Sequence, residues 1–149
     1  MRYFVKTDGA SRGNPGLSGW GGVVEDEDGN ILLEVKGFLG IGTNNAAEYS
    51  AIGLTLVALG RFLEESFDAP SNATVHVFSD SLLAVKQLNG EYKVGEKFQR
   101  INEIITEQAN EVFKECKFSH IPRTENSLAD RLANEAIDDH LRKIGVDEV

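Results

Sequence analysis

Two aspartates in this 149-residue sequence, Asp8 and Asp80, each stand at the end of a short run of β-forming residues. A carboxylate at the end of a central strand is costly to bury unless hydrogen bonds or a cation compensate its charge. Two such aspartates side by side would repel each other, and one would take up a proton unless a metal ion lay between them. The pair therefore indicates divalent-metal chemistry. For Asp80 alone, a role as a turn former or helix cap is the better interpretation.

Glu48 and Asp130 lie near the starts of two helical patterns, where negative charge interacts favourably with the helix dipole. That interaction alone could account for both residues. Glu48 also interrupts a run, 46–59, that is otherwise almost wholly apolar, and a helix of that composition must cover a sheet. From such a helix Glu48 could lean over the crevice, so both interpretations stay open for it. For Asp130 taken alone, the structural interpretation is favoured.

The elements that would carry these acids follow from hydrophobic periodicity and turn residues. The dipeptide Asp28-Gly29 is a hairpin signal, so the strands on either side of it should pair antiparallel. We predict strands at 2–8, 19–25, 31–39, 74–78 and 118–121, and helices at 45–63, 97–114 and 126–141, with a short helix from about Ser81 to Leu88.

This order, βββαβααβα, defines an α/β fold with a mixed sheet. Nearly all crossover connections between parallel strands are right-handed, which places the fourth strand beside and parallel to the first. The sheet should then have five strands in order 3-2-1-4-5, flanked by helices. Ligands bind such sheets where the chain leaves neighbouring strands in opposite directions, at their carboxyl ends. Asp8 and Asp80 stand at those two ends.

The composition limits the class of protein. Hydrophobic residues make up 41% and charged residues 26%, so we expect one globular domain over 1–149. The apolar run 51–60 is too short to cross a membrane, and the N-terminal residues do not form a signal peptide. The single cysteine, Cys116, cannot form an internal disulfide. We therefore expect a cytoplasmic protein with no membrane association and no obligate protein partner.

The formal net charge of -9 is unfavourable for nonspecific binding to nucleic acid, because phosphate contacts normally come from clustered Lys and Arg. A site that holds divalent cations is nevertheless expected to be acidic, and the bound cations would reverse its local charge. Charge alone therefore does not decide whether nucleic acid is the substrate.

The segments around the four acids closely resemble the ribonuclease H family. Any one of these motifs is weak, but four in the family's order with compatible spacing are specific, and the similarity covers essentially the whole chain. The matching segments are Thr7-Asp8-Gly9-Ala10-Ser11 with Gly13-Asn14-Pro15-Gly16, Thr43-Asn44-Asn45-Ala46-Ala47-Glu48, Ser79-Asp80-Ser81, and Glu125-Asn126 followed by Ala129-Asp130 and Leu132-Ala133.

The resemblance implies the same 3-2-1-4-5 sheet and an enzyme that cleaves the RNA strand of an RNA/DNA hybrid. It also implies that two Mg²⁺ ions, for which Mn²⁺ can substitute, are bound by Asp8, Glu48, Asp80 and Asp130. Mg²⁺ prefers hard oxygen ligands, and two metals about 3.5–4 Å apart can bind both the attacking water and the leaving 3′-oxygen. Asp8 would bridge the metals, Glu48 would bind the one nearer the substrate 2′-hydroxyl, and Asp130 would serve the water-activating metal.

The resemblance implies four substrate-binding residues as well. Asn14 and Asn45 match positions that contact the minor groove, where the 2′-hydroxyl identifies RNA. A turn role for Asn14 and helix capping for Asn45 are compatible alternatives. Thr43 resembles a residue that helps hold a DNA-strand phosphate. Arg123 is the better candidate for the place of the family's mobile loop histidine, because the nearest histidine, His120, is expected to lie on a strand.

The sequence departs from many relatives in two further places. The segment 89–94 passes directly to the next helix without a basic helical protrusion, as in a shorter subgroup known among archaea and some bacteria. Leu82 stands where many members have a glutamine that reads the minor groove. We also expect no separate N-terminal hybrid-binding domain, so hybrid affinity should be modest.

Three alternatives stay open. A nucleic-acid-binding module of this fold without catalysis would not need all four acids, which are present. Resolvase, transposase and exonuclease domains of related fold generally share the early aspartate, but not Gly-Asn-Pro-Gly together with Thr-Asn-Asn-x-x-Glu. A small acidic metal-binding protein would leave the clustered asparagines unexplained.

Overall fold

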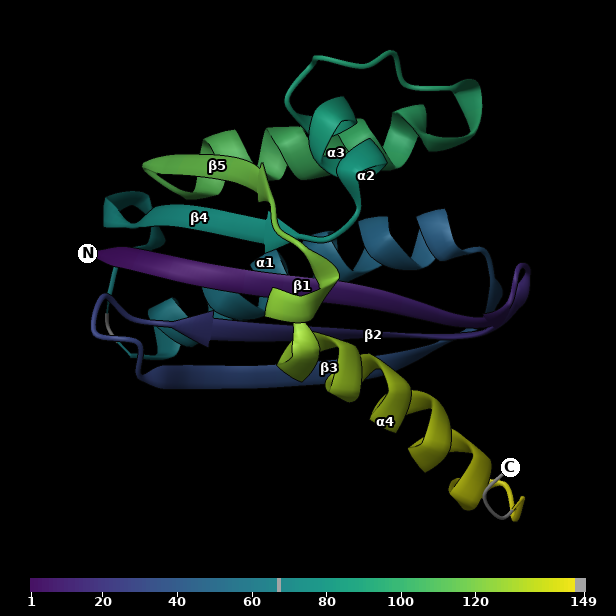
Figure 1. The fold of residues 1–149 in the computed structure, drawn as a ribbon. Helices are drawn as coiled ribbons and strands as arrows, with labels where there is room; N and C mark the ends of the chain where they lie inside the picture. The colour runs from purple at the N-terminus through teal and green to yellow at the C-terminus, as the bar shows by residue number, and fades with distance from the viewer. Residues whose placement is uncertain (67, 147–149) are drawn as a thin grey trace.

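A five-stranded mixed sheet forms the centre of the protein, with its strands in the order β3-β2-β1-β4-β5 (Figure 1). The structure is a computed structural model that describes residues 1–66 and 68–146. β1 pairs antiparallel with β2 and parallel with β4, so the predicted strand order is confirmed. The strands are β1 (Arg2–Gly13), β2 (Gly16–Glu25), β3 (Ile31–Gly42), β4 (Thr74–Ser79) and β5 (Glu115–His120).

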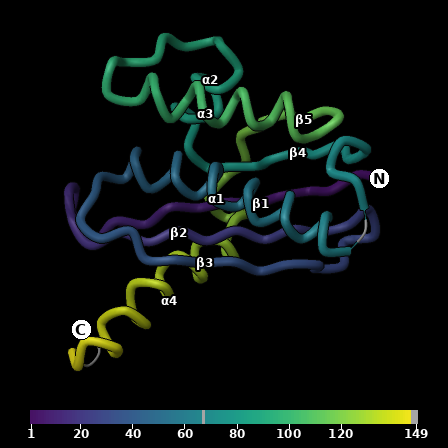
Figure 2. The backbone as a smooth tube through the Cα atoms, turned by 180° about the vertical axis from the view of Figure 1, so that it is seen from behind, coloured from purple at the N-terminus to yellow at the C-terminus, as the bar shows by residue number. Residues whose placement is uncertain are grey.

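Helices cover both faces of this sheet. Helix α1 lies across one face and α4 across the other, as the two opposite views in Figures 1 and 2 show. α3 packs against α1. The helices are α1 (Asn44–Glu65), α2 (Leu82–Leu88), α3 (Glu96–Val112) and α4 (Ser127–Lys143), with short 3-10 helices at η1 (Pro70–Asn72) and η2 (Arg123–Glu125).

The main core lies between α1 and the sheet. Its largest fully buried side chains come from one stripe of α1 and from the facing positions of β1, β2 and β4, where branched residues alternate with half-buried ones. They are Tyr49, Ile52, Leu56, Leu59 and Leu63 on the helix, and Val5, Val24, Val75 and Val77 on the strands, and Ile105 of α3 joins the same core.

Glycines allow both helices to approach the sheet at backbone distance. A Cβ added to Gly9 on β1 would lie 2.2 Å from the carbonyl carbon of Ala47 on α1. On the opposite face, a Cβ added to Gly21 on β2 would lie 2.5 Å from the carbonyl oxygen of Ala129 on α4. Any larger residue at Gly9 or Gly21 would therefore push a helix off the sheet.

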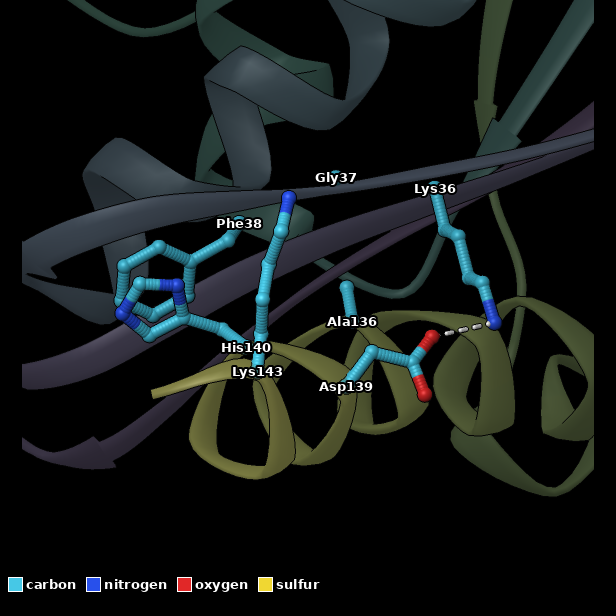
Figure 3. A pocket seen from close by; sticks show the side chains of 7 residues that line it. All are labelled: Lys36, Gly37, Phe38, Ala136, Asp139, His140 and Lys143. Carbon is cyan, nitrogen blue, oxygen red and sulfur yellow. Dashed lines mark ion pairs between the residues drawn. The ribbon is translucent and has the colours of Figure 1, made fainter. Parts of the chain in front are cut away.

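The C-terminal half of α4 is attached to β3 (Figure 3). The rings of Phe38 and His140 stack with their centroids 3.7 Å apart and only 6° between their planes. Nearby, Lys36 forms ion pairs of 3.3 Å with Glu135 and 2.9 Å with Asp139. Exposed ion pairs of this kind contribute little to stability. The buried apolar face of α4, the glycine contacts and the stacked rings therefore hold the helix on the sheet.

Helix α1 is longer than the apolar run seen in the sequence. By length and hydropathy alone its 22 residues could cross a membrane, and about half of the most apolar window is buried inside the protein. Its buried stripe faces the sheet, which is the arrangement of a core helix in a globular protein.

The observed strands are longer than predicted. β1 continues to Gly13 rather than ending at Asp8, because β2, which begins at Gly16, pairs with β1 from Phe4 to Gly13. The parallel partner β4 ends earlier, at the pair formed by Thr7 and Ser79. Asp8 therefore lies inside β1, at the point where β4 leaves the sheet, and not at the end of its own strand. β3 extends to Gly42, and β5 begins earlier than predicted, at Glu115, and ends at His120.

We expect Gly21→Ala to destabilise the protein by about 1–3 kcal/mol, the usual cost of overpacking a core, because its methyl group would collide with α4. Gly60→Ala is the matched control. Gly60 is buried inside α1, but an added Cβ would have no contact closer than 3.8 Å, to Val112. It should stabilise the helix by up to about 1 kcal/mol. Urea unfolding of both variants tests this. An unchanged urea midpoint for Gly21→Ala would contradict the close packing of α4 on β2 at Gly21.

Candidate active site

Asp8 is a buried carboxylate in the middle of the sheet. Its side chain is 5% exposed, and its strand partner on β2 is Gly21, against which α4 packs closely. On the other edge of β1, β4 has already ended. The carboxylate therefore borders a gap in the sheet, where other side chains can reach it.

Glu48 enters this gap from α1. The close approach of Gly9 to Ala47 brings the helix against β1, and the Gly9 N–H donates a 2.7 Å hydrogen bond to Glu48 Oε1. Glu48 is the fifth residue of α1, beyond the first turn, and it is only 9% exposed. The helix dipole acts mainly on the first turn. The structure therefore supports the interpretation in which Glu48 leans over the crevice.

Asp80 follows β4 and precedes α2, and its side chain serves neither as a turn former nor as a cap. Ser81 caps the helix, since its Oγ accepts from the Ala84 N–H at 3.2 Å. Ser79 Oγ accepts from the Ser81 N–H at 3.1 Å and so closes the turn. These neighbouring hydroxyls satisfy the local backbone and leave the Asp80 carboxylate free to face Asp8.

Asp8, Glu48 and Asp80 form a tight cluster. Each offers one carboxylate oxygen, and these three oxygens lie within 4.8 Å of one another. Burial, followed by the negative charge of Asp80, raises the pKa of Asp8 to about 8. Burial and the charges of Asp8 and Asp80 raise the pKa of Glu48 to about 10. Oxygen donors held this close against their own repulsion are the donor set that a divalent cation fits.

Asp130 stands at the rim of the cluster rather than within it. It lies in the first turn of α4 and is exposed. A cavity of about 310 Å³ is lined by Asp130 together with Asp8 and Glu48. Its carboxylate is near enough to Asp8 to contribute to the raised pKa there. The structure thus brings all four predicted acids to one site, three in close contact and the fourth beside them.

Three of the predicted substrate-binding residues surround the N-terminus of α1. Asn14 Oδ1 accepts a 3.0 Å hydrogen bond from the Asn44 N–H, which ties the β1–β2 turn to the helix. Thr43 is the N-cap, and its Oγ1 accepts from the Ala46 N–H at 3.2 Å. Asn45 is therefore not the helix cap, as its alternative interpretation supposed, and its side chain is exposed. Their contacts with nucleic acid stay predictions.

Arg123 and His120 occupy different places. Arg123 belongs to η2 and lines the carboxylate cavity beside Asp130. His120 is the last residue of β5, paired with Ser79, and it is exposed. His120 does not line that cavity. The strand assignment of His120 is confirmed, and Arg123 is the cationic side chain at the site.

Sequence reasoning missed three asparagines at this site, of which Asn44 lines the cavity at the start of α1. Asn134 lines the cavity, and its Nδ2 lies 3.4 Å from Asp130 Oδ1. The spacing of four residues along one helix face could have identified it. Asn126 is 1% exposed, and its Nδ2 donates to the Thr7 carbonyl at 2.8 Å. An asparagine before a helix is ordinarily taken for a cap, so the sequence held no signal for this contact.

Comparisons with known proteins agree with this geometry. Residues 6–136 match the family model described as Reverse transcriptase-like. The chain is 38% identical over 138 residues to a ribonuclease HI from Halobacterium salinarum, covering 93% of this chain but only 65% of that protein's length. It is 30% identical to a ribonuclease H from Caldanaerobacter subterraneus, with 93% of each chain covered.

A solved structure extends the match to three dimensions. The crystal structure of LC11-RNase H1 in complex with an RNA/DNA hybrid superimposes with a TM-score of 0.86 at 40% sequence identity, covering 93% of this chain and 99% of that one. The sheet order, the carboxylate cluster and these similarities lead to one conclusion: the chain belongs to the ribonuclease H family, whose members depend on metal ions.

Proposed function

We propose that this protein is an endonuclease that hydrolyses the RNA strand of RNA/DNA hybrids with two divalent metal ions, Mg²⁺ or in its place Mn²⁺. The observation that carries the proposal is the cluster of Asp8, Glu48 and Asp80, in which Asp80 is half-buried, with Asp130 at its rim. The similarity to LC11-RNase H1, a protein crystallised with such a hybrid, supports the choice of substrate.

Asp8, Glu48, Asp80 and Asp130 would hold the metal ions. When bound, such ions lower the pKa of an attacking water and neutralise the charge that develops on the phosphate. Asp8 is central among the ligands because its carboxylate borders, from β1, the gap that the end of β4 leaves in the sheet. The Gly9 N–H keeps one Glu48 oxygen oriented, which leaves the other oxygen of that carboxylate free. Asp130, being exposed, can adjust its position as substrate enters.

The hybrid would bind across the N-terminus of α1. Asn14, Thr43 and Asn45 lie together there, and asparagine amides can both donate to and accept from a 2′-hydroxyl. The connection between α2 and α3, residues 89–95, is short and contains no helix. With no basic protrusion at this place, the protein would depend on metal ions and on these polar contacts for affinity.

A cytoplasmic location and action without an obligate protein partner stay part of this proposal. The alternative of a binding module without catalysis makes a different prediction in one assay. A labelled RNA/DNA hybrid, tested beside RNA/RNA and DNA/DNA duplexes with and without Mg²⁺, should be cut in its RNA strand and only with metal, and the RNA/RNA lane shows whether that duplex is also a substrate. Tight hybrid binding without cleavage would favour the binding module.

Asp80→Asn should abolish hybrid cleavage while leaving the fold intact. Removing one of the crowded acids relieves repulsion in the metal-free protein, so its melting temperature in chelator should hold or rise. Asp28→Asn, in the exposed turn between β2 and β3, changes the net charge equally and should cleave normally. Near-normal cleavage by Asp80→Asn would contradict the assignment.

Metal-free stability should fall as pH rises. Asp8 and Glu48 have folded-state pKa values near 8 and 10, well above the values of about 4 expected in the unfolded chain. Between those limits the folded state binds more protons, so each step up in pH destabilises it. Urea unfolding in chelator from pH 5.5 to 9 should show that the free energy of unfolding falls more steeply with pH for the wild type than for Glu48→Gln.

Mg²⁺ should reduce this pH dependence, because the cation competes with protons for the same oxygens. Its stabilising effect should therefore be larger at pH 8.5 than at pH 6. If the free energy of unfolding in chelator fell equally with pH for the wild type and Glu48→Gln, the result would show that the cluster does not hold the protons assigned to it.

Arg123→Ala should lower turnover without abolishing it. The guanidinium lines the cavity, where its positive charge can attract a phosphate. His120→Ala is the paired comparison and should change activity little. Cleavage kinetics across pH 5.5–8 should give the same profile with and without His120. A larger loss of kcat for His120→Ala than for Arg123→Ala would reverse the two assignments.

A further inference from the structure

Asn126 occupies the N-cap position of α4 but does not cap it. Its side chain makes no hydrogen bond to the first turn of the helix, although asparagine is among the preferred residues for that bond. The side chain is turned into the protein instead and is 1% exposed. Its amide Nδ2 lies 2.8 Å from the Thr7 carbonyl oxygen and 3.4 Å from Asp80 Oδ2.

This single amide joins three segments that carry the acids. Thr7 immediately precedes Asp8 on β1, and Asp80 follows β4. The Asn126 backbone carbonyl also accepts the Asp130 N–H at 3.1 Å, within α4. The strands and the helix that supply Asp8, Asp80 and Asp130 are therefore tied together at one buried side chain.

The chemistry of the amide suits a carboxylate that must also bind a cation. Both partners of Nδ2 are acceptors, so the NH₂ group has to face them and the orientation of the amide is determined. A neutral donor orients one oxygen of Asp80 while adding no positive charge. A lysine or arginine at this place would compete with a cation for the carboxylates.

We propose that Asn126 is a positioning residue, which sets the Asp80 carboxylate relative to Asp8 and thereby the affinity of the cluster for divalent metal. The inference rests on the proposed function for the identity of the reaction, but its test does not require cleavage. Residues that orient metal ligands in this way typically contribute 10-fold to 100-fold in affinity.

Mn²⁺ titration of the free protein by calorimetry, without nucleic acid, is the primary test. Asn126→Ala should bind Mn²⁺ about 10-fold to 100-fold more weakly than the wild type. In hybrid cleavage it should need correspondingly more Mn²⁺ for half-maximal kcat, while KM for the hybrid stays unchanged. A purely structural role would lower stability without moving the metal requirement.

A second variant separates positioning from capping. Asn126→Ser keeps a good N-cap residue but lacks the amide donor, so it should bind Mn²⁺ as weakly as Asn126→Ala. Restoration of wild-type affinity by serine would overturn the proposal. Circular dichroism of each variant in chelator establishes that it is folded before the titration.

Gln87→Ala is the matched control. Gln87 is another buried amide, 7% exposed, which accepts from the Tyr49 hydroxyl and donates to the Lys93 carbonyl. It should lose stability but keep its Mn²⁺ affinity. Equal weakening by Gln87→Ala would overturn the proposal, because the effect would then be a general loss of rigidity.

The two proposals fail in distinguishable ways. If the wild type binds Mn²⁺ but does not cut hybrids, the proposed function is wrong, whereas a selective effect of Asn126→Ala on Mn²⁺ would still support positioning. If Asn126→Ala binds Mn²⁺ like the wild type while Asp80→Asn does not, the cluster is a metal site and the positioning role is wrong.

Discussion

The arrangement of the carboxylates depends on one close contact, the approach of α1 to β1 at Gly9. An added Cβ there would lie 2.2 Å from the Ala47 carbonyl carbon, so only glycine allows the helix to sit so near the strand. This contact places Glu48 against Asp8 and gives it the Gly9 N–H as a partner. With α1 displaced outward, Glu48 would return to solvent and the cluster would lose one of its three acids.

The fold holds these acids in an arrangement that electrostatics opposes. Burial and mutual repulsion raise the pKa values of Asp8 and Glu48, which means that the ionised cluster is destabilising until a cation offsets it. The apolar stripe of α1 packed on β1 and β4 supplies the opposing stability. The neighbouring elements hold the acids together without metal. Because these acids already repel one another, a cation that relieves the repulsion binds more favourably.

The topology was predictable because it follows from two local signals, the Asp28-Gly29 hairpin and a right-handed crossover. The meeting of Asp8 and Asp80 followed from that topology. The extension of β1 to Gly13 was not predictable, because residues 9–13 are strand only through tertiary pairing with β2. Glu48 was ambiguous because the helix dipole alone could account for an acid near the start of a helix. The separation of Asp130 from the tight cluster depends on the path of α4, which sequence periodicity does not encode.

The path of α4 is itself set from both ends. At its start, Asn126 reaches the Thr7 carbonyl and Asp80. Along its length it rests on the glycines of β2, and near its end His140 stacks on Phe38 of β3. Because a helix is stiff, a shift at the His140 end would be transmitted as a tilt at Asp130. The contacts of α4 with β3 therefore help to position Asp130, although they touch none of the other three acids. The exposed side chain of Asp130 can adjust only around a backbone that the seated helix holds in place.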